Sequence, residues 1–378
     1  MNILKAPAGE LLQLLQALAS VVERRHAMPV LSQVLISKAG EQLAFTTSDL
    51  ELQLRLETTL GAGSGHGQAT APVLKLLDIL KALPPEQEAV LTSTPQRLSL
   101  SAGRSRFTLQ SLPAGDFPLQ APAHDLEDAF SLPPALLRQL LEQVDFAMAV
   151  QDIRYYLNGL LLHTEGQQLR LVATDGNRLA VAEATLDHGL PTHSAILPRK
   201  TVHALQRHLR TPRSAAGAAE PQVQVRLAPQ QACFQMPGAT LLSKLVEGRF
   251  PDYTRVLPQH PRQRLQLDRA ELLAALQRVA VLTNERFRGV RLHIEGGLLQ
   301  LSAENGEQEA ADVELAVLGQ APDDAPLNFG FNLVYLVDVL SRSHAAQVRL
   351  AVVDDRSPVL FTFDDRPGFQ YVVSPMRL

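Results

Sequence analysis

The feature that most constrains this chain is a ten-residue pattern that occurs three times. The copies are GEQLAFTTSD (40–49), GQQLRLVATD (166–175) and GGLLQLSAEN (296–305). Corresponding positions lie 126 and 130 residues apart. A spacing of this size is the length of a domain, whereas solenoid repeats recur about every 20–50 residues. We therefore expect three similar domains in tandem.

Each copy is flanked by strand patterns. An apolar run precedes it, and after the first copy Leu50, Leu52, Leu54 and Leu56 alternate with polar residues. Strict alternation is typical of a strand with one buried and one solvated face. Asp49 and Asp175 stand at equivalent positions between two strands, where a side chain that caps a hairpin turn explains both.

Each domain also contains two helical patterns. Apolar residues recur at helical spacing from Leu11, from Leu137 and from Leu272, and second helices are expected at residues 73–83, 198–209 and 333–340. Pro72 and Pro198 suit the first turn of a helix. The fold class is therefore α+β, with a helical layer against antiparallel sheets in each of three domains at residues 1–122, 128–255 and 264–378.

Composition excludes several classes of protein. Hydrophobic residues make up 46% of the chain and charged residues 20%, which is enough apolar material for ordinary cores. No apolar stretch approaches the ~20 residues of a membrane span, and the N-terminus does not resemble a secretion signal. Cys233 is the single cysteine, so an intrachain disulfide or a cysteine-built zinc site is excluded. We expect a cytoplasmic protein.

Catalytic motifs are absent from the sequence. It contains no zinc-protease, serine-hydrolase or P-loop pattern, so we expect no enzyme activity, no cofactor and no metal. The alternative is a metal-dependent nuclease that uses the acidic pairs Asp323-Asp324, Asp354-Asp355 and Asp364-Asp365, because two-metal phosphoryl chemistry needs clustered carboxylates. Solvated turns are the simpler interpretation of these pairs. Three domains without catalytic groups favour a function based on shape, such as a segment of a closed ring.

Several stretches resemble one known family over nearly the whole chain, the β subunits of bacterial DNA polymerase III, or sliding clamps. The stretches are GRSRF (103–107), LPAGDFP (112–118), QDIRYYLNG (151–159), ATDGNRLA (173–180), LPRK (197–200), SKLVEGRFPDY (243–253), NERFRGVR (284–291) and PMRL (375–378).

The resemblance implies a ring-shaped, head-to-tail homodimer of three-domain subunits, with helices lining the hole and sheets outside. Its partners would be double-stranded DNA, held without sequence preference, and DNA polymerase subunits and the clamp loader, which insert short linear motifs into a groove. The function would be that of a processivity factor. A variant copy that serves in resistance or repair would keep the same ring and groove, so this alternative stays open.

Sliding requires phosphate contacts without base readout. A net charge of −4 does not oppose this, because the hole can be basic while the outside is acidic. The expected DNA contacts are cations of the second helices, with Arg213 just beyond, and positions implied by the resemblance; they are Lys75, Lys81, Arg199, Lys200, Arg207, Arg210, Arg25, Gln151, Tyr155 and Tyr156.

The resemblance also implies a peptide groove that is apolar with a few polar anchors. Its expected residues are Leu157, Thr174, Gly176, Asn177, Arg178, Leu179, Pro251, Arg255, Val256, Val372, Val373, Ser374, Pro375, Met376, Arg377 and Leu378. Asn177 stands where the family often has histidine, and Ser374 where it often has an apolar residue. These departures concern peptide preference.

The seam between two subunits would join a sheet edge of the first domain to one of the third. The resemblance places Phe107 and Leu109 against Val281 and Leu282. Basic residues would face acidic ones; they are Lys75, Arg97, Arg104 and Arg106 against Glu307, Glu309 and Asp312. Ala310 and Val313 stand where relatives often have acids, so we expect few ion pairs and a dimer that is weakly sensitive to salt.

Overall fold

The computed structural model describes residues 2–23, 27–61, 63–123, 126–210, 221–283, 288–318 and 326–377. Arg25, Arg213, Leu378 and the pair Asp323-Asp324 lie outside the described residues. The chain forms two compact units, residues 1–139 with 197–247 and residues 140–196 with 248–378, which are described in turn. Within the described ranges, no helix has the length and apolar character needed to cross a membrane.

The larger sheet of the first unit combines strands from two repeats. Its eight strands are, in spatial order, β5 (His66–Pro72), β2 (Gln33–Ala39), β3 (Gln42–Ser48), β4 (Leu52–Thr58), β14 (Ala239–Lys244), β13 (Gln231–Met236), β12 (Val223–Leu227) and β9 (Glu127–Leu132). The first four belong to the first repeat and the last four to the second. Antiparallel pairing of β4 with β14 therefore joins two repeats in one continuous sheet.

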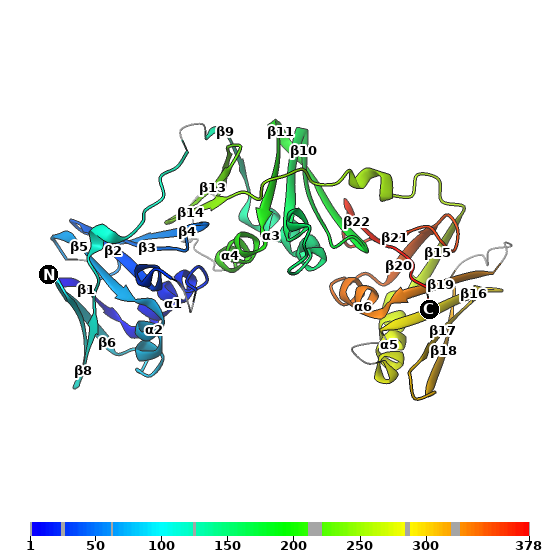
Figure 1. Cartoon of the computed structure of the whole chain (residues 1–378), viewed down its shortest axis with the longest axis horizontal. Helices are drawn as coiled ribbons and strands as arrows, with labels where there is room; N and C mark the ends of the chain where they lie inside the picture. The colour runs from blue at the N-terminus through cyan, green and yellow to red at the C-terminus, as the bar shows by residue number, and fades with distance from the viewer. Residues whose placement is uncertain are drawn as a thin grey trace. The chain divides into compact units, whose positions relative to one another are not determined.

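A second sheet of the first unit has four strands. In spatial order they are β1 (Asn2–Pro7), β6 (Glu88–Thr94), β7 (Arg97–Ala102) and β8 (Ser105–Gln110). The helices are α1 (Ala8–Leu18), α2 (Val73–Lys81) and α4 (Arg199–Leu209), and α1 packs against α2 (Figure 1). Both helices bury leucines at helical spacing, among them Leu11, Leu15 and Leu77. Pro72 and Pro198 are the residues directly before α2 and α4, one position earlier than expected.

The second unit repeats the same construction. A six-stranded sheet has the order β10 (Gly159–Thr174), β11 (Arg178–Pro198), β22 (Phe369–Val373), β21 (Val359–Phe363), β20 (Gln347–Val352) and β15 (Gln263–Asp268). A four-stranded sheet has the order β18 (Ala310–Ala316), β17 (Leu298–Glu304), β16 (Gly289–Glu295) and β19 (Leu327–Asn332). Pairing of β11 with β22 joins the second repeat to the third.

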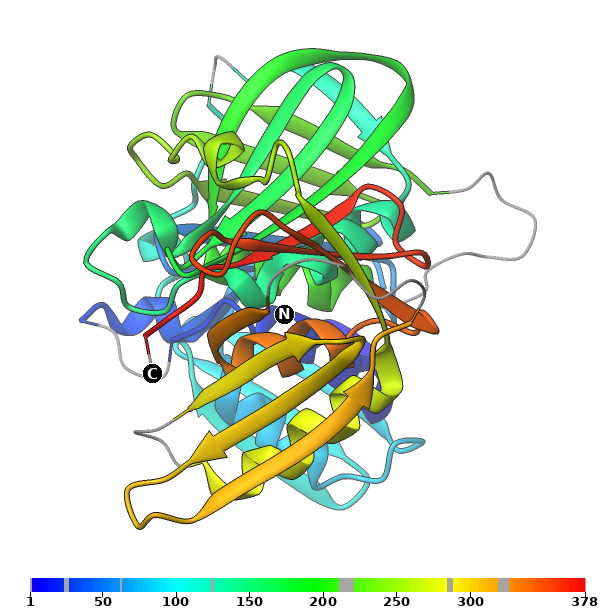
Figure 2. The ribbon, with the colours of Figure 1, turned by 90° about the vertical axis from the view of Figure 1, so that its right-hand side faces the viewer.

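Helices cover these sheets as the sequence predicts. The second unit contains α5 (Arg269–Val279) and α6 (Leu333–Ser341), which pack against each other, and α5 contacts β17 and β18. Figure 2 shows α5, in yellow, behind the four-stranded sheet. The remaining helix, α3 (Pro134–Val144), buries Leu137, Leu140, Leu141 and Val144. The three-domain α+β class with two helices in each repeat is confirmed.

The repeated turns are capped in the same way. The Oδ1 atom of Asp49 accepts hydrogen bonds from the backbone N–H groups of Glu51 and Leu52, 2.9 and 2.6 Å away. Asp175 accepts the equivalent pair from Asn177 and Arg178. In the third repeat, Asn305 accepts from Glu307 and Glu309, because this turn is one residue longer. The turn-capping role expected for Asp49 and Asp175 is confirmed.

Candidate binding groove and flanking surfaces

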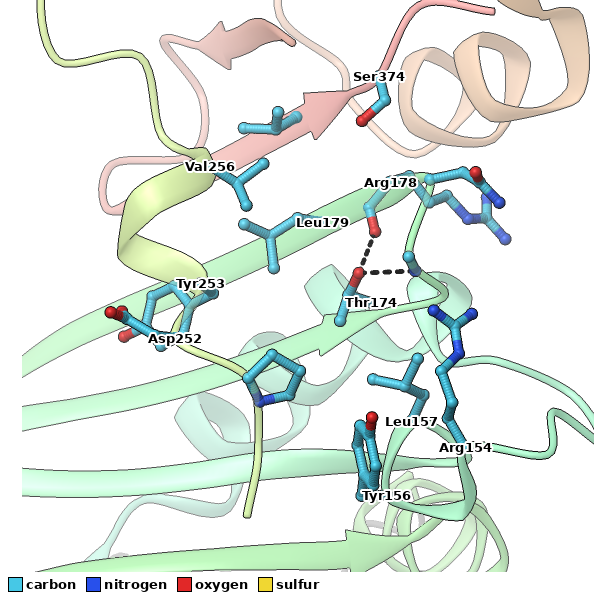
Figure 3. A pocket seen from close by; sticks show the side chains of 14 residues that line it. Arg154, Tyr156, Leu157, Thr174, Arg178, Leu179, Asp252, Tyr253, Val256 and Ser374 are labelled. Atoms are coloured by element: carbon cyan, nitrogen blue, oxygen red, sulfur yellow. Dashed lines mark hydrogen bonds between the residues drawn. The ribbon is translucent and has the colours of Figure 1, made fainter.

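An apolar groove lies in the second unit, where β11 of the second repeat meets β22 of the third. Leu157, Leu179, Val256 and Val372 supply apolar side chains, and Pro251 also lines the groove. Figure 3 shows Leu179 and Val256 directed toward one another across this groove, with Thr174 and Leu157 below them. A concave apolar surface with few polar groups is what a short linear peptide motif requires.

Strand pairing places the floor of the groove. Leu179 on β11 is directly opposite Val372 on β22, so both side chains point to the same face of the sheet. A short 3₁₀ turn at Tyr253–Val256 covers this face, and Val256 is 38% exposed there. Thr174 fixes the adjoining turn, because its hydroxyl donates to the carbonyl of Arg178 at 2.6 Å and accepts from the N–H of Gly176 at 3.0 Å (Figure 3).

Arg154 forms one rim of the groove. Its guanidinium donates to the Asp152 carboxylate at 2.8 Å and to the carbonyl of Asp175 at 3.1 Å. The hydrogen bond from Arg154 lowers the pKa of the Asp152 carboxyl to about 2. Gly176, beneath this guanidinium, has a φ of +92°, and a Cβ atom there would lie 2.9 Å from an Arg154 nitrogen. A side chain at this position would therefore adopt a strained backbone conformation and displace the Arg154 guanidinium.

Arg178 serves the groove with its backbone and the interior with its side chain. Its guanidinium donates to Asp175 at 3.0 Å, to Asp338 at 2.6 Å and to the carbonyl of Phe146 at 2.6 Å. It also lies over the ring of Tyr335, 4.4 Å from the centroid. Burial alone would lower the pKa of Arg178, but Tyr371, Asp338 and Asp175 raise it above its ordinary value. In Figure 3 the guanidinium points away from the apolar side chains of the groove.

The structure brings most of the expected groove residues together. Those that line the cavity are Leu157, Thr174, Gly176, Asn177, Arg178, Leu179, Pro251, Val256, Val372 and Ser374. The other described residues of the expected groove do not line it. Val373 is buried and points to the opposite face of the sheet, and Arg255 is paired with Asp252. Met376 and Arg377 line a separate cavity with Arg288 and Arg291. Pro375 is half-buried between them.

Four lining residues were not expected in the groove, namely Arg154, Tyr156, Asp252 and Tyr253, of which Tyr156 was expected to contact DNA. All four fall inside two stretches that carry the family resemblance, residues 151–159 and 243–253. Their position inside these stretches was the sequence signal that could have identified them as groove residues.

The expected DNA contacts of the first unit lie on two helices. Lys75 and Lys81 are exposed on α2, and Lys81 is 3.4 Å from Asp78. On α4, Arg207 is exposed, Arg210 follows the last turn, and Arg199 begins the helix half-buried. Lys200 differs, because its ammonium group is bonded to Asp49 and lies 3.0 Å from Glu23. Its charge is therefore already partly neutralised within the chain.

The expected DNA contacts of the second unit lie in the loop before the groove. Gln151 is exposed and has a φ of +55°, a backbone conformation that costs energy for a residue with a side chain. Tyr155 is 57% exposed and packs edge-on against Tyr156, with ring centroids 5.8 Å apart. Tyr156 also lines the groove, so this loop adjoins both surfaces.

The expected seam residues lie at two sheet edges. In the described residues β8 and β18 are each paired on one side only. Phe107 and Leu109 are half-buried on β8, while Arg104 and Arg106 are exposed, as is Arg97 on β7. Val281 is 79% exposed and Leu282 is half-buried just after α5. Glu307, Glu309 and Asp312 are exposed at or beside β18.

The described acidic pairs of the third repeat are engaged in local contacts. Asp354 caps a turn by accepting from the N–H groups of Arg356 and Ser357. Asp364 is paired with Arg349 at 2.6 Å, and Asp365 accepts from Ser343 and His344. The part of the chain that the structure describes contains no cluster of three or more histidine, cysteine or acidic side chains fit to hold a metal.

Comparison with known proteins follows the same three-part division. Residues 7–121, 131–252 and 254–377 match the N-terminal, central and C-terminal domains of the DNA polymerase III beta subunit. The chain is 42% identical to the beta sliding clamp of Pseudomonas aeruginosa over 371 residues, which cover 97% of this chain and 98% of the relative. It is 39% identical to that of Escherichia coli K12 over 368 residues, with the same coverage.

Solved structures agree with these relatives. The sliding clamp of Pseudomonas aeruginosa bound to griselimycin superposes with a TM-score of 0.91 at 40% identity, and each chain is fully covered. The sliding clamp of Bartonella birtlesii, also bound to griselimycin, gives a TM-score of 0.91 at 32% identity with full coverage of both chains. No finding supports the nuclease alternative. The chain therefore belongs to the DNA polymerase III β-subunit family, the β sliding clamps.

Proposed function

We propose that this chain is a DNA polymerase processivity factor that acts as a cytoplasmic, non-catalytic ring. Two copies close head to tail around duplex DNA, and the groove of each copy holds a short motif of the polymerase or the clamp loader. The observation that carries the proposal is that, among the residues the structure describes, the edge strands β8 and β18 are each paired on one side only.

Two strand pairings within the chain show how the sheet of one repeat joins the sheet of the next. Strand β4 pairs with β14, and β11 pairs with β22, so each junction joins the strand after a capped turn to the last strand of the next repeat. By the same equivalence, β18 of the third repeat corresponds to β4, and β8 of the first repeat corresponds to β14. A second copy can supply the missing partner to each, which closes a ring and removes two exposed edges.

The equivalence also gives a register for this seam. Gln53 on β4 pairs with Leu242 on β14. Gln53 is the first residue paired after the turn capped by Asp49, and Ala310 is the first residue paired after the turn capped by Asn305, so the two positions are equivalent. The matching hairpins β13–β14 and β7–β8 equate Leu242 with Thr108. Thr108 of one copy therefore lies opposite Ala310 of the other. Phe107 then lies opposite Ala311, and Arg106 lies opposite Asp312, an ion pair of the kind expected at the seam.

DNA retention in this proposal comes from closure more than from affinity. Exposed cations on α2 and α4, such as Lys75 and Arg207, attract phosphates, while Gln151 and Tyr155 offer further contacts. A few phosphate contacts give binding without sequence preference and permit sliding. The net charge of −4 limits stronger nonspecific binding.

The groove is the proposed tether. Its apolar floor at Leu179 and Val372 suits the anchor side chains of a linear motif, and Arg154 and Thr174 supply polar contacts at the rim. Because relatives from two bacteria bind griselimycin, we expect the same compound to occupy this groove.

Light scattering tests the ring. The wild-type protein is expected at twice the chain mass of 41.3 kDa. Phe107→Asp places a charge on the edge β8 and is expected to give monomers with unchanged circular dichroism. Leu298→Asp is the control, because Leu298 is a 51% exposed leucine at the start of β17. Its cross-strand partner Ala316 stands at the end of β18, beyond the residues that the proposed register pairs with β8. A monomeric wild type, or dimers that survive Phe107→Asp as they survive Leu298→Asp, would refute the seam.

A further inference from the structure

We propose that Asp338 is a positioning residue for the peptide groove, which it orders through Arg178 from the opposite face of the sheet. This inference rests on the proposed function of the groove. It assigns a binding role to a residue on α6 that does not line the cavity.

Arg178 and Leu179 are consecutive on β11 and therefore point to opposite faces of the sheet. Leu179 forms the floor of the groove together with its opposite residue Val372. Arg178 points to the other face, where its side chain is 11% exposed. A displacement of the Arg178 backbone also displaces Leu179, because the two residues are consecutive on β11.

The guanidinium is held from three directions. Asp175 comes from the turn before β11, the carbonyl of Phe146 follows α3, and Asp338 comes from α6. Two aromatic rings, Tyr335 and Phe146, flank it at 4.4 and 5.5 Å. Tyr335 stands one helical turn before Asp338 on α6, so this helix contacts the guanidinium with both a carboxylate and an aromatic ring.

The hydrogen bond from Arg178 to Asp338 joins the second repeat to the third. Asp175 and Phe146 belong to the second repeat, as Arg178 does, whereas Asp338 and Tyr335 belong to the third. The groove itself crosses the same boundary, because Leu179 and Val372 come from β11 and β22. The pair between Arg178 and Asp338 therefore ties β11 of the second repeat to α6 of the third repeat, on the face of the sheet opposite the groove.

The pair is partly buried, since the side chain of Asp338 is 32% exposed and that of Arg178 is 11% exposed. Removing one partner of such a charge-assisted pair leaves the other less well compensated, and the freed side chain rearranges. In an Asp338 variant, Arg178 keeps its bonds to Asp175 and to the carbonyl of Phe146 and its contact with Tyr335, but loses its ion pair with α6. The start of β11, which carries Leu179, is then held less firmly from the face opposite the groove, although β11 stays paired with β22. We expect weaker binding even though Asp338 makes no contact with the ligand.

The test measures the dissociation constant of griselimycin by calorimetry for a double-mutant cycle. Asp338→Asn is expected to weaken binding about tenfold, and Asp338→Glu to recover most of it. In an Arg178→Met background, Asp338→Asn is expected to change the constant by less than about twofold, because its action passes through Arg178. A purely structural role would instead give independent effects that multiply.

Asp364→Asn is the matched control. Asp364 also lies in the third repeat and also forms a 2.6 Å pair with an arginine, Arg349, but neither residue lines the groove. Its removal is expected to leave griselimycin binding unchanged. Asp338→Asn that binds as the wild type does, or a loss that persists in full in Arg178→Met, would overturn the inference. If the wild-type protein does not bind griselimycin, both the proposed function of the groove and the role of Asp338 are refuted.

Should Arg178→Met fold poorly, Tyr335→Leu takes its place in the cycle. This variant removes the ring over the guanidinium but keeps an apolar side chain on α6. Binding by Tyr335→Leu and by Asp338→Asn is then expected to be weakened non-additively. Additive losses would count against the inference.

Discussion

The ammonium group of Lys200 is bonded to the carboxylate of Asp49, and this pair ties the start of α4 to a turn of the first repeat. The Asp49 side chain is 4% exposed, while Lys200 is 33% exposed. The same carboxylate caps its turn through the N–H groups of Glu51 and Leu52. The main role of Lys200 is therefore to join the second repeat to the first through this ion pair, although the sequence pattern groups it with the cations of α4 that are expected to bind DNA.

Replacing Lys200 with methionine separates these roles. Lys200→Met leaves Asp49 buried without its cation, which is expected to cost about 1–3 kcal/mol of unfolding free energy. Its effect on DNA affinity is expected to be small. Arg207→Met, on the exposed face of the same helix, is expected to leave stability unchanged and to reduce the salt slope of DNA binding by about 1. Denaturant unfolding and DNA titrations at several salt concentrations measure both. The opposite ranking of the two variants in either assay would contradict the assignment.

A pair of cysteines tests the register of the seam. Residues directly opposite in antiparallel strands have Cα atoms about 4.5–5.5 Å apart, which is within disulfide range. Thr108→Cys combined with Ala310→Cys is expected to give a covalent dimer under oxidation, because the native Cys233 is buried. Phe107→Cys with Ala310→Cys is the control, since these side chains would point to opposite faces. Denaturing gel electrophoresis without reductant distinguishes them, and efficient cross-linking of the control alone would show that the register is shifted by one.

Gly176→Ala tests the rim of the groove. A residue with a side chain at positive φ costs about 1–2 kcal/mol, and here the new Cβ also meets Arg154. We expect both lower stability and weaker griselimycin binding. Gly166→Ala is the control for backbone strain, because Gly166 also has a positive φ, +61°, with nothing within 4 Å of its Cβ position. Equal griselimycin affinity for the two variants would show that Arg154 does not depend on the bare glycine.

The dimer is expected to be weakly sensitive to salt. In the proposed register the half-buried Phe107 and Leu109 face the partner strand, and Ala310 and Val313 supply no charge. Few ion pairs then remain to be screened. Sedimentation equilibrium across a range of salt concentrations measures the dimer dissociation constant. A steep rise of that constant with salt would mean that arginine–carboxylate pairs, and not apolar contacts, hold the seam.

Local features of the fold were predictable from sequence because local physics determines them. The leucines at helical spacing in α1 and the alternating leucines of β4 specify their elements and buried faces. The capped turns at Asp49 and Asp175 were predictable because an Asx side chain at that position satisfies two backbone N–H groups.

Long-range pairing was not predictable in the same way. Nothing in the alternation of β4 shows that its edge pairs with β14 of the next repeat, because any strand edge presents the same backbone groups. The bonds of Arg178 to Asp338 and of Lys200 to Asp49 join residues 160 and 151 positions apart. For the groove, the resemblance identified Leu179 and Val372, but not the supporting positions Tyr335 and Asp338 on the other face of the sheet.

Retention on closed versus linear DNA tests the central claim most directly. The protein is placed on a nicked circular plasmid by its clamp loader with ATP, separated from free protein, and followed after the circle is cut once. We predict that the protein stays on the intact circle and leaves within the time needed to slide off the ends once the DNA is linear. Equal loss from circular and linear DNA would contradict a closed ring held by topology.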